Sequence, residues 1–573
     1  MKKRITFFVA SVSLMILAFA TTNLGKLQAQ TSAMGEGSIQ KIDLPSKAKK
    51  DARFKVGSLY YTFLNEAKGQ VAVAPCLDFE SMYQYDIVIP ETIKYAKKGE
   101  PEKEYTVVAI GKSAFANCFN LSSVKIPQTI VTIGDVAFWG TSLEEIILPN
   151  SVEEIGNRCF KASVRLRTLH IGKGLKKYGA DLFDGCWNLQ DIEVDPDNTV
   201  LKSENGILYD KAQTVVMRCP SFRKSVKKIE LPSTVTKVAR GAFEYCRYIE
   251  ELVLNEGLKE IGGNAFYLCS GLKTMKIPAS VEKIEDGSAF ILLAGCEKFD
   301  VDPANPHYST LMNGRILFNK ETKTMVSLLY TTDKATITIP AEVEHIGAAA
   351  MMVILEGGMD EYYGGKGTEQ VILPENLLSI GNFAFAGTNI GSIKVPDKVE
   401  EIPNGMVADC KRLTFVALGK GCKKIGFGVF EDCSRLMNDR TGVIRCYAEV
   451  PPQMAQNSKG EYAEFNEEVV KRTVLQVPEA SVSNYVRADG WKAFLRIKKF
   501  EGQANEDVVA ATLSIKPSKG MLTIVTTEEA PLCVYALDGT ILYTTTDMQA
   551  TVELPQGVYI VTYQGKAYKA QVL

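Results

Sequence analysis

The sequence predicts an elongated solenoid with a parallel strand ladder, built from stacked coils of 22 or 23 residues. A β-rich cap precedes the coils, and a small antiparallel β-sandwich follows them. Two observations predict this fold class: an aliphatic residue followed by proline recurs at a fixed period, and phenylalanines recur at the same period in a separate column. Such a period is typical of repeat architectures, in which each unit buries its apolar face against its neighbours.

The aliphatic–proline pairs give the period directly. They begin at Ile126, Leu148, Leu231, Ile277, Ile339, Leu373 and Val395. Further copies without the proline occur at Ile171, Leu254 and Leu418. Val194 and Val301, each followed by Asp-Pro, occupy two further positions of the repeat. Most neighbouring copies lie 22 or 23 residues apart, and wider gaps follow residues 194, 301 and 339. A chain of 573 residues is too long for one compact core, which also favours a stack of coils.

Residues 121–143 show how one coil is expected to form. Val124 and Ile126 alternate with polar residues, which predicts a short strand with one buried face. Pro127 has no amide hydrogen to donate to a ladder, so it ends the strand. Phe138 then fills the core from a tight turn.

The phenylalanine column predicts a line of bulky core residues. It comprises Phe115, Phe138, Phe160, Phe183, Phe243, Phe266, Phe385 and Phe430. Cysteines follow several of these by three residues: Cys118, Cys186, Cys246, Cys269 and Cys433, with Cys296 and Cys410 in similar positions. Disulfides or a metal ladder are the alternative interpretations. We favour small buried thiols, because no pair has CxxC spacing and no histidine accompanies them.

The repeated pattern Val-Lys-Ile-Pro, Val-Thr-Ile-Gly, Ala-Phe, Cys and Leu resembles the BspA-type leucine-rich repeat of bacterial surface proteins over residues 105–445. The resemblance implies a curved, right-handed leucine-rich-repeat solenoid. Two longer stretches, residues 195–220 and 302–330, resemble the long variant of this repeat. Each is expected to form a β-hairpin, with its turn at Asn205-Gly206 or Asn313-Gly314.

Both ends of the array need capping units, because a bare end would expose the core. We assign residues 30–104 to an amino-terminal β-rich cap and 446–503 to a carboxy-terminal cap. In the latter, residues 473–477 are expected to form the last strand, followed by a helical stretch.

Residues 504–573 contain six or seven short strand-like runs and are expected to form the β-sandwich. Leu537-Asp538-Gly539 and the run 554–560 resemble the sorting domain of type IX secretion substrates. The Asn-Pro opening of that family is absent, and an ordinary accessory β-domain is the alternative.

Residues 1–29 are typical of a secretory signal peptide. Lys2, Lys3 and Arg4 precede an apolar run over residues 5–20, and small residues offer cleavage sites after Ala20 or Ala29. Later apolar runs are shorter than the roughly 18 residues that a membrane helix needs, so we expect no transmembrane span in the mature chain. The protein is therefore expected to be secreted or on the cell surface.

Motifs that carry chemistry are weak in this sequence. The three histidines fall in different coils, and no catalytic, cofactor-binding or metal-ligating set is expected. Gly111-Lys112-Ser113 lacks the upstream glycine of a phosphate-binding loop. The Asp-Pro-x-Asn runs at 195 and 302 could bind calcium, but their identical phase in the repeat favours turns. The 66 basic and 67 acidic residues nearly cancel, which argues against a nucleic-acid partner.

The outward side of the strands remains as a binding surface. Candidate contact residues are Lys125, His170, Glu193, Lys276, Ile372 and Phe415, together with Tyr362 and Tyr363 in a glycine-flanked insertion. We expect an exported, non-catalytic protein that binds an extracellular protein or glycan. The family resemblance adds a role as an adhesin. A scaffold protein of the cell envelope and, more remotely, a solenoid hydrolase are the alternatives, and the sequence leaves the ligand and the oligomeric state open.

Overall fold

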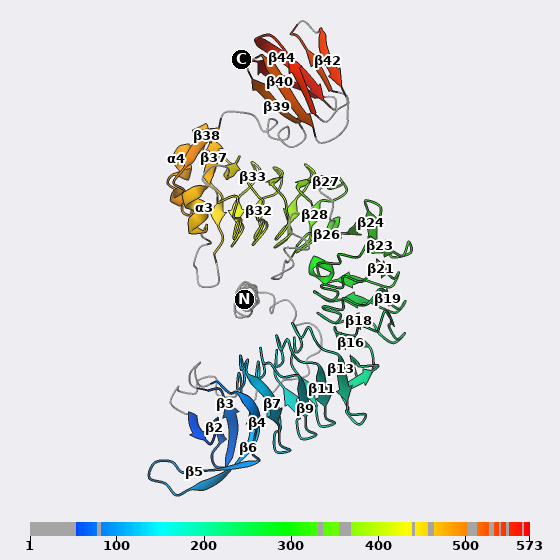
Figure 1. Ribbon diagram of the computed structural model, residues 1–573, viewed down its shortest axis with the longest axis vertical. Helices are drawn as coiled ribbons and strands as arrows, with labels where there is room; N and C mark the ends of the chain where they lie inside the picture. Colours follow the sequence, from blue (N-terminus) through cyan, green and yellow to red (C-terminus); the bar gives the residue numbers. More distant parts are fainter. Residues whose placement is uncertain are drawn as a thin grey trace.

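The computed structural model describes residues 53–76, 82–329, 336–353, 368–437, 442–456, 463, 465–500, 513–518, 520–526, 532–537, 540–545, 549–563 and 566–572. The proposed signal peptide and the loop with Tyr362 and Tyr363 lie outside these ranges. The coils stack into a solenoid that follows a curved arc from β2 (Leu59–Asn65) to β37 (Val474–Pro478) (Figure 1). The predicted repeat solenoid with parallel strand ladders is confirmed.

Each regular coil contains two strands, and each of them belongs to a different parallel ladder, which we call the long ladder and the short ladder. The long ladder contains β4 (Tyr85–Val88), β7 (Leu121–Lys125), β9 (Glu145–Leu148), β11 (Thr168–Ile171), β13 (Asp191–Val194), β17 (Lys228–Glu230), β19 (Glu251–Val253), β21 (Thr274–Ile277), β23 (Lys298–Val301), β27 (Thr336–Thr338), β29 (Gln370–Ile372), β31 (Ser392–Lys394), β33 (Phe415–Leu418), β35 (Val443–Cys446), β37 and β38 (Ile497–Phe500). Its register follows the repeat: Glu145 pairs with Thr168, 23 residues later.

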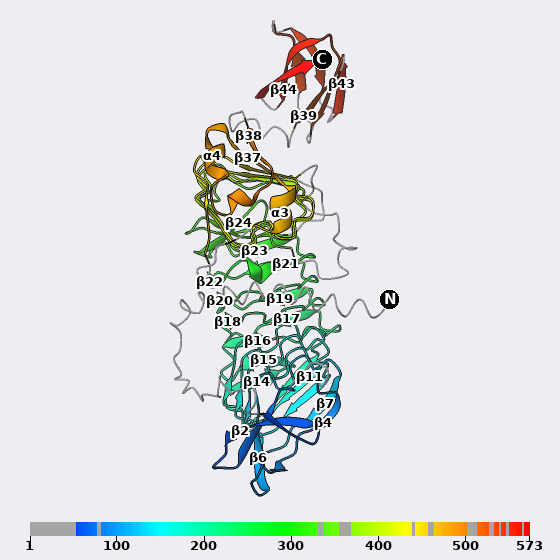
Figure 2. The same ribbon diagram turned by 90° about the vertical axis from the view of Figure 1, so that its left-hand side faces the viewer.

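The short ladder consists of two-residue strands. It contains β8 (Thr132–Ile133), β10 (Glu154–Ile155), β12 (Lys177–Tyr178), β18 (Lys237–Val238), β20 (Glu260–Ile261), β22 (Lys283–Ile284), β28 (His345–Ile346), β30 (Ser379–Ile380), β32 (Glu401–Ile402), β34 (Lys424–Ile425) and β36 (Gln453–Met454). Figure 2 looks into the arc and shows β18, β20 and β22 beside β17, β19 and β21. A glycine follows most of the short strands and allows close stacking of the coils: a Cβ on Gly134 would lie 2.6 Å from the amide nitrogen of Lys112.

A third side of each coil is a turn that also bonds to its neighbours. The amide of Phe115 donates to the carbonyl of Ala137, and Phe138 repeats this toward Cys159. The residues two positions before and two positions after each phenylalanine of the predicted column have left-handed backbone conformations. Some of them are not glycine, such as Val136 (φ 49°) and Leu268 (φ 57°). These conformations are costly for β-branched or bulky residues, so the bonds between coils must hold them in place.

The predicted phenylalanine column is confirmed. Phe115, Phe138, Phe160 and Phe183 stack with ring-centroid separations of 5.3, 5.9 and 5.9 Å. Beyond the first insert the stack resumes at Phe243 and Phe266, 5.7 Å apart, and continues to Phe290. Phe290 is in a 3₁₀ turn (Gly287–Phe290) and was not part of the predicted column.

The cysteine column is buried and carries free thiols, as predicted. The thiols donate to the preceding coil: Cys186 to the Phe160 carbonyl at 3.2 Å and Cys269 to the Phe243 carbonyl at 3.0 Å. Where a coil has no cysteine at this position, Ser163 makes the same bond to Phe138 at 2.8 Å. The position therefore requires a small side chain with a hydrogen-bond donor.

The two inserts form three-stranded antiparallel meanders, which confirms the predicted hairpins and adds a strand to each. The first contains β14 (Leu201–Glu204), β15 (Ile207–Asp210) and β16 (Val215–Arg218); the second contains β24 (Tyr308–Leu311), β25 (Ile316–Asn319) and β26 (Thr324–Leu328). The third strand of each insert, β16 or β26, pairs in parallel with the next strand of the short ladder. Each insert thus supplies the short strand of a coil.

The Asp-Pro-x-Asn runs form turns at the start of each insert, as predicted. The amide of Asn305 donates to the carbonyls of Pro278 and Val281 at 2.8 and 3.1 Å, and its oxygen accepts the amides of His307 and Tyr308. Asn198 makes the equivalent bond to Gly172. Both asparagines are buried, so their side chains tie the insert to the preceding coil.

At the amino-terminal end, β1 (Arg53–Val56), β2 and β3 (Gln70–Ala74) form an antiparallel meander. Strand β6 (Lys103–Ile110) then runs parallel to both β3 and β8, so this meander continues into the short ladder. Strand β5 (Thr92–Tyr95) pairs with β6 as a hairpin, and β4 extends the long ladder through β7.

At the carboxy-terminal end, helix α3 (Glu467–Arg472) precedes β37, and α4 (Val482–Tyr485) follows it. The expectation that residues 473–477 form the last strand is wrong, because β38 pairs with β37 and extends the ladder. Tyr485 and Trp491, which lie in the chain between β37 and β38, are fully buried. The Tyr485 hydroxyl donates to the carbonyl of Ala448, and Nε1 of Trp491 donates to that of Pro452. These aromatic side chains cover the end of the core.

The last described residues form two antiparallel sheets around a common apolar core. One contains β39 (Leu513–Ser518), β40 (Met521–Thr526) and β43 (Gln549–Glu553); the other contains β41 (Leu532–Tyr535), β42 (Ile541–Thr545), β44 (Gly557–Tyr563) and β45 (Lys566–Val572). Among the described residues, no helix has the length and apolar content needed to cross a membrane.

Candidate ligand-binding face

The outward residues of the long ladder form two parallel rows. In β9, Ile146 and Leu148 are buried while Glu145 and Ile147 are exposed, as expected for a strand with one buried face. The first row runs through Asp86, Ser123, Glu145, Thr168, Asp191, Lys228, Glu251, Thr274, Lys298, Thr336, Gln370, Ser392, Phe415, Val443 and Val474. The second row runs through Val88, Lys125, Ile147, His170, Glu193, Glu230, Val253, Lys276, Asp300, Thr338, Ile372, Lys394, Ala417, Arg445, Gln476 and Lys498.

Three of the predicted contact residues share the amino-terminal part of the second row. Lys125 is exposed at the end of β7, and His170 and Glu193 are paired in register. His170 lies between two carboxylates: its Nε2 is 3.2 Å from Glu145 and its Nδ1 is 2.8 Å from Glu193. Carboxylates outnumber lysines and arginines in this part of both rows. The carboxylates are those of Asp86, Glu145, Asp191 and Glu193, and the one lysine is Lys125.

Lys276 belongs to the middle of the ladder and lies far along the chain from these residues. It pairs in register with Asp300. Lys228, in the same part of the face, contacts Glu230 at 2.8 Å and Glu251 at 3.3 Å. Opposite charges therefore balance in the middle of both rows.

The carboxy-terminal part combines cations with aromatic rings. Ile372 and Phe415 are half-buried here rather than fully exposed. The guanidinium of Arg445 lies 5.5 Å from the ring centre of Phe415 and 5.3 Å from that of Phe500. Its Nε donates to Gln476 at 2.8 Å, which fixes the orientation of the guanidinium plane.

Two residues of the second row, Ala417 and Arg445, differ from what the repeat pattern alone indicates. By the alternation of its strand Ala417 belongs to the outward row, but it is fully buried, because it is a small residue paired between Lys394 and Arg445, whose side chains are long. Arg445 itself was missed, since the 28-residue spacing from Leu418 to Cys446 breaks the period. The alternation in Val443-Ile444-Arg445-Cys446 was the available signal.

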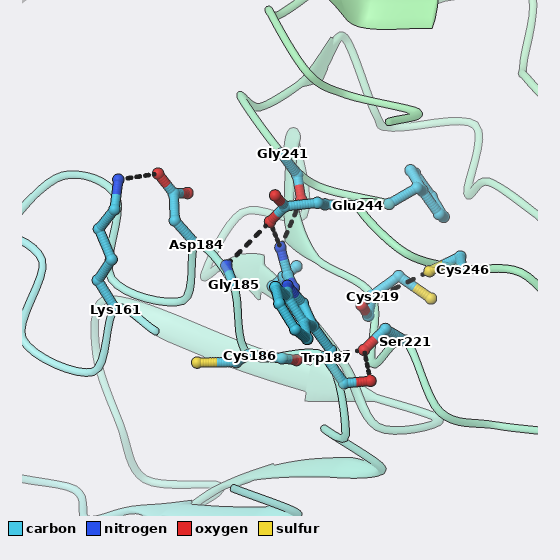
Figure 3. A network of polar contacts seen from close by, with 12 residues as sticks. Lys161, Asp184, Gly185, Cys186, Trp187, Cys219, Ser221, Gly241, Glu244 and Cys246 are labelled. Carbon is cyan, nitrogen blue, oxygen red and sulfur yellow. Dashed lines mark hydrogen bonds and ion pairs between the residues drawn. The ribbon is translucent and has the colours of Figure 1, made fainter. Parts of the chain in front are cut away.

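The charged network nearest the core is structural. Arg218 is buried, and its Nη1 donates to Glu244 at 3.0 Å and to the Gly241 carbonyl at 2.7 Å. Glu244 also accepts the amide of Gly185, and Ser221 donates to the Trp187 carbonyl (Figure 3). Burial raises the pKa of Glu244, and the positive charge of Arg218 opposes this effect. The network joins the coils on either side of the first insert.

The described residues offer little for catalysis. Within them, no group of three or more His, Cys, Asp or Glu side chains is arranged to hold a metal ion. The Nδ1 of His345 lies 2.7 Å from the Ser379 hydroxyl on the short ladder, in a shallow depression that also includes Lys323 and Glu344. Lys323 contacts Glu344 at 2.6 Å, so that carboxylate is committed to an ion pair.

Burial also makes the thiols unsuited to nucleophilic chemistry. It raises the pKa of Cys118, Cys186 and Cys410 to about 12, so each thiol stays protonated near neutral pH.

A family model described as the BspA type Leucine rich repeat region, in six copies, matches residues 102–210, 213–301 and 358–440. Among solved structures, a leucine rich cell surface protein from Faecalibacterium prausnitzii is 19% identical, with 79% of this chain and 96% of that chain covered and a TM-score of 0.38. A leucine-rich repeat protein from Bacteroides ovatus is 18% identical over 78% and 100% of the two chains, with a TM-score of 0.29. The pneumococcal vaccine antigen PcpA is 16% identical over 78% and 99%, with a TM-score of 0.32. No curated protein matches the chain in sequence.

Proposed function

We propose that this chain, which resembles BspA-type leucine-rich repeat proteins over residues 102–210, 213–301 and 358–440, is an exported, non-catalytic binding protein. Its long ladder would recognise a protein or glycan outside the cell. The observation that carries the proposal is the pair of outward rows, which run from β4 to β38 over five successive hydrogen-bonded segments of the long ladder. A solenoid of this kind provides an extended contact surface instead of a single pocket. The apolar run that follows Lys2, Lys3 and Arg4 supports export.

The binding part of the proposal is tested with the mature chain, residues 30–573, applied to immobilised extracellular proteins and glycans. Saturable binding supports a role as an adhesin. The double variant Tyr362→Ala/Tyr363→Ala is expected to weaken that binding, whereas Tyr178→Ala on the short ladder serves as a control. Absence of binding, together with cross-linking of the chain to components of its own envelope, would establish the scaffold role instead.

For residues 504–573 we propose a role in sorting during secretion. The support is the resemblance of Leu537-Asp538-Gly539 and the run 554–560 to sorting domains of the type IX pathway. The mass of the protein recovered outside the cell tests this role. Loss of a carboxy-terminal segment of this size supports it, and an intact carboxy terminus on the secreted chain contradicts it.

A further inference from the structure

The charge of the two rows changes sign along the ladder. Near the amino-terminal end, the two rows together contain four carboxylates and one lysine, as described above. From β27 to β38 the described positions of both rows hold three cations, Lys394, Arg445 and Lys498, and neither Asp nor Glu. The nearby carboxylate of Glu375 is 3.6 Å from Lys394 but lies outside the rows. A surface with this composition favours a negatively charged ligand.

The cations recur on every second strand. In the second row, Lys394 pairs with Ala417, Ala417 with Arg445, Arg445 with Gln476, and Gln476 with Lys498. Neighbouring strands lie about 4.8 Å apart, so successive cations are separated by about 9.6 Å along the ladder. A bound chain that runs along this row would meet a positive charge at that interval.

Aromatic rings accompany the cations. Phe415 belongs to the strand between Lys394 and Arg445, and its half-buried ring is held beside the Arg445 guanidinium. Phe500 lies on the strand that carries Lys498, with its ring 5.1 Å from Tyr447. Aromatic faces offer apolar contact to the C–H faces of sugar rings, while guanidinium and ammonium groups bind carboxylates.

We propose that the face from β31 to β38 binds an extended, β-linked acidic polysaccharide with one carboxylate per disaccharide. Two pyranose rings of such a chain span about the same length as two ladder spacings, about 9.6 Å. An extended acidic peptide fits less well, because carboxylates on one side of it recur every 6.8 Å or so. Duplex nucleic acid is also a poor match, since the phosphates of each strand recur at about 3.4 Å of rise along the helix axis. This inference rests on the proposed binding function and names a ligand class for it.

The direct test is titration calorimetry of the whole mature chain with a hyaluronan decasaccharide, which carries one carboxylate per disaccharide. Binding that weakens with salt is expected. Lys394→Gln and Lys498→Gln are each expected to raise the Kd by about threefold to tenfold, as for loss of one charge-assisted contact. Lys283→Gln and Lys424→Gln remove exposed lysines of the short ladder, which lies outside both rows, and are expected to leave the Kd unchanged.

The spacing is tested by moving a charge without removing it. The double variant Gln476→Lys/Lys498→Gln shifts one cation by a single strand and keeps the net charge. It is expected to bind as weakly as Lys498→Gln alone. Restored affinity would show that only the total charge matters and would overturn the proposal, provided that thermal unfolding shows both variants to be folded.

Competing ligands provide the remaining outcomes. A neutral chitin oligosaccharide and a polyglutamate peptide of equal charge are expected to bind more weakly than hyaluronan. Equal or tighter binding of polyglutamate, or no binding of hyaluronan, would overturn the proposal. The general binding function would survive that result if the chain still bound immobilised extracellular proteins, so the two failures are distinguishable.

Discussion

Nη1 of Arg218 lies 3.0 Å from Oε2 of Glu244 in the interior of the solenoid, where only 2% of the arginine side chain is exposed. The two residues are 26 positions apart and occupy opposite sides of the boundary between the first insert and the next coil. A buried pair of this kind does little for net stability, but removal of one partner leaves an uncompensated charge.

Glu244→Ala is therefore expected to destabilise the chain by about 3–5 kcal/mol, because the Arg218 charge would remain buried without its partner. Urea unfolding followed by circular dichroism measures this change. Glu250→Ala provides the control, since Glu250 is exposed and contacts Lys227 at 2.9 Å on the surface. If both variants unfolded at the same urea concentration, the Arg218 charge would not depend on Glu244.

Asn305→Asp is expected to destabilise the second insert by several kcal/mol, on the order of 3. The substitution keeps the shape of the side chain but replaces an amide donor with a carboxylate that faces the carbonyls of Pro278 and Val281. Thermal unfolding provides the measurement. The exposed Asn120→Asp introduces the same charge without this burial, and an equal loss of stability in both variants would contradict the explanation.

The thiol positions are expected to tolerate serine better than alanine. Cys186→Ser keeps a donor for the Phe160 carbonyl, as Ser163 already does for Phe138. Ser163→Ala is expected to cost about 1–3 kcal/mol, because a buried carbonyl and the Thr141 hydroxyl lose their common partner. The urea concentrations at the midpoint of unfolding are measured for the unchanged chain, Cys186→Ser and Ser163→Ala, and are expected to fall in that order. A Cys186→Ser variant that is less stable than Ser163→Ala would argue against a hydrogen-bonding role.

Iodoacetamide at pH 8 is expected to modify only Cys76 and Cys533 in the folded chain. These two of the thirteen cysteines are partly exposed, and the other eleven are buried. Burial raises the pKa of thiols such as Cys186 to about 12, so almost no thiolate forms at this pH. Peptide mass spectrometry identifies the modified residues, and all thirteen should react after denaturation in urea. Rapid modification of Cys186 in the folded chain would contradict the packing.

Stability is expected to fall as the pH drops from 7 to 3. Ion pairs with neighbouring lysine or arginine side chains lower the pKa of several exposed carboxylates, namely Glu144 through Arg165, Glu250 through Lys227, Glu282 through Lys259 and Glu344 through Lys323. A lowered pKa in the folded state stabilises the fold above the unfolded pKa, and this contribution is lost as the pH falls through the folded pKa. The urea concentration at the midpoint of unfolding should therefore fall from pH 7 to pH 3, and it should depend less on pH in 1 M salt. A midpoint that rises toward pH 3 would contradict it.

The periodic part of the fold could be predicted because each signal repeats. Phe138 and Cys186 stand for whole columns, and an error in one coil would be corrected by the next. The left-handed conformations of Val136 and Leu268 could not be predicted, because neither residue type favours them. Bonds to the next coil impose those conformations, and such contacts leave no local mark in the sequence.

The candidate face was predicted as far as the period holds. Lys125, His170 and Phe415 lie in the outward rows, whereas Arg445 follows an irregular spacing and was missed. Strand β38 was missed for a similar reason: it returns to the ladder only after α4 and the buried Trp491. Ala417 shows a different limit of the pattern, because alternation gives the direction of a side chain but not the length of its neighbours, which bury it.

The apolar interior of the solenoid is divided at the two inserts. One buried cluster extends from Phe54 to Leu208, a second from Ile207 to Leu329, and a third from Ile316 to Phe494. A tether between a cell and an anchored ligand would carry tension along this stack. Under a pulling force the solenoid should lengthen in three separate steps, one for each of these clusters, and so absorb mechanical work before the attachment breaks.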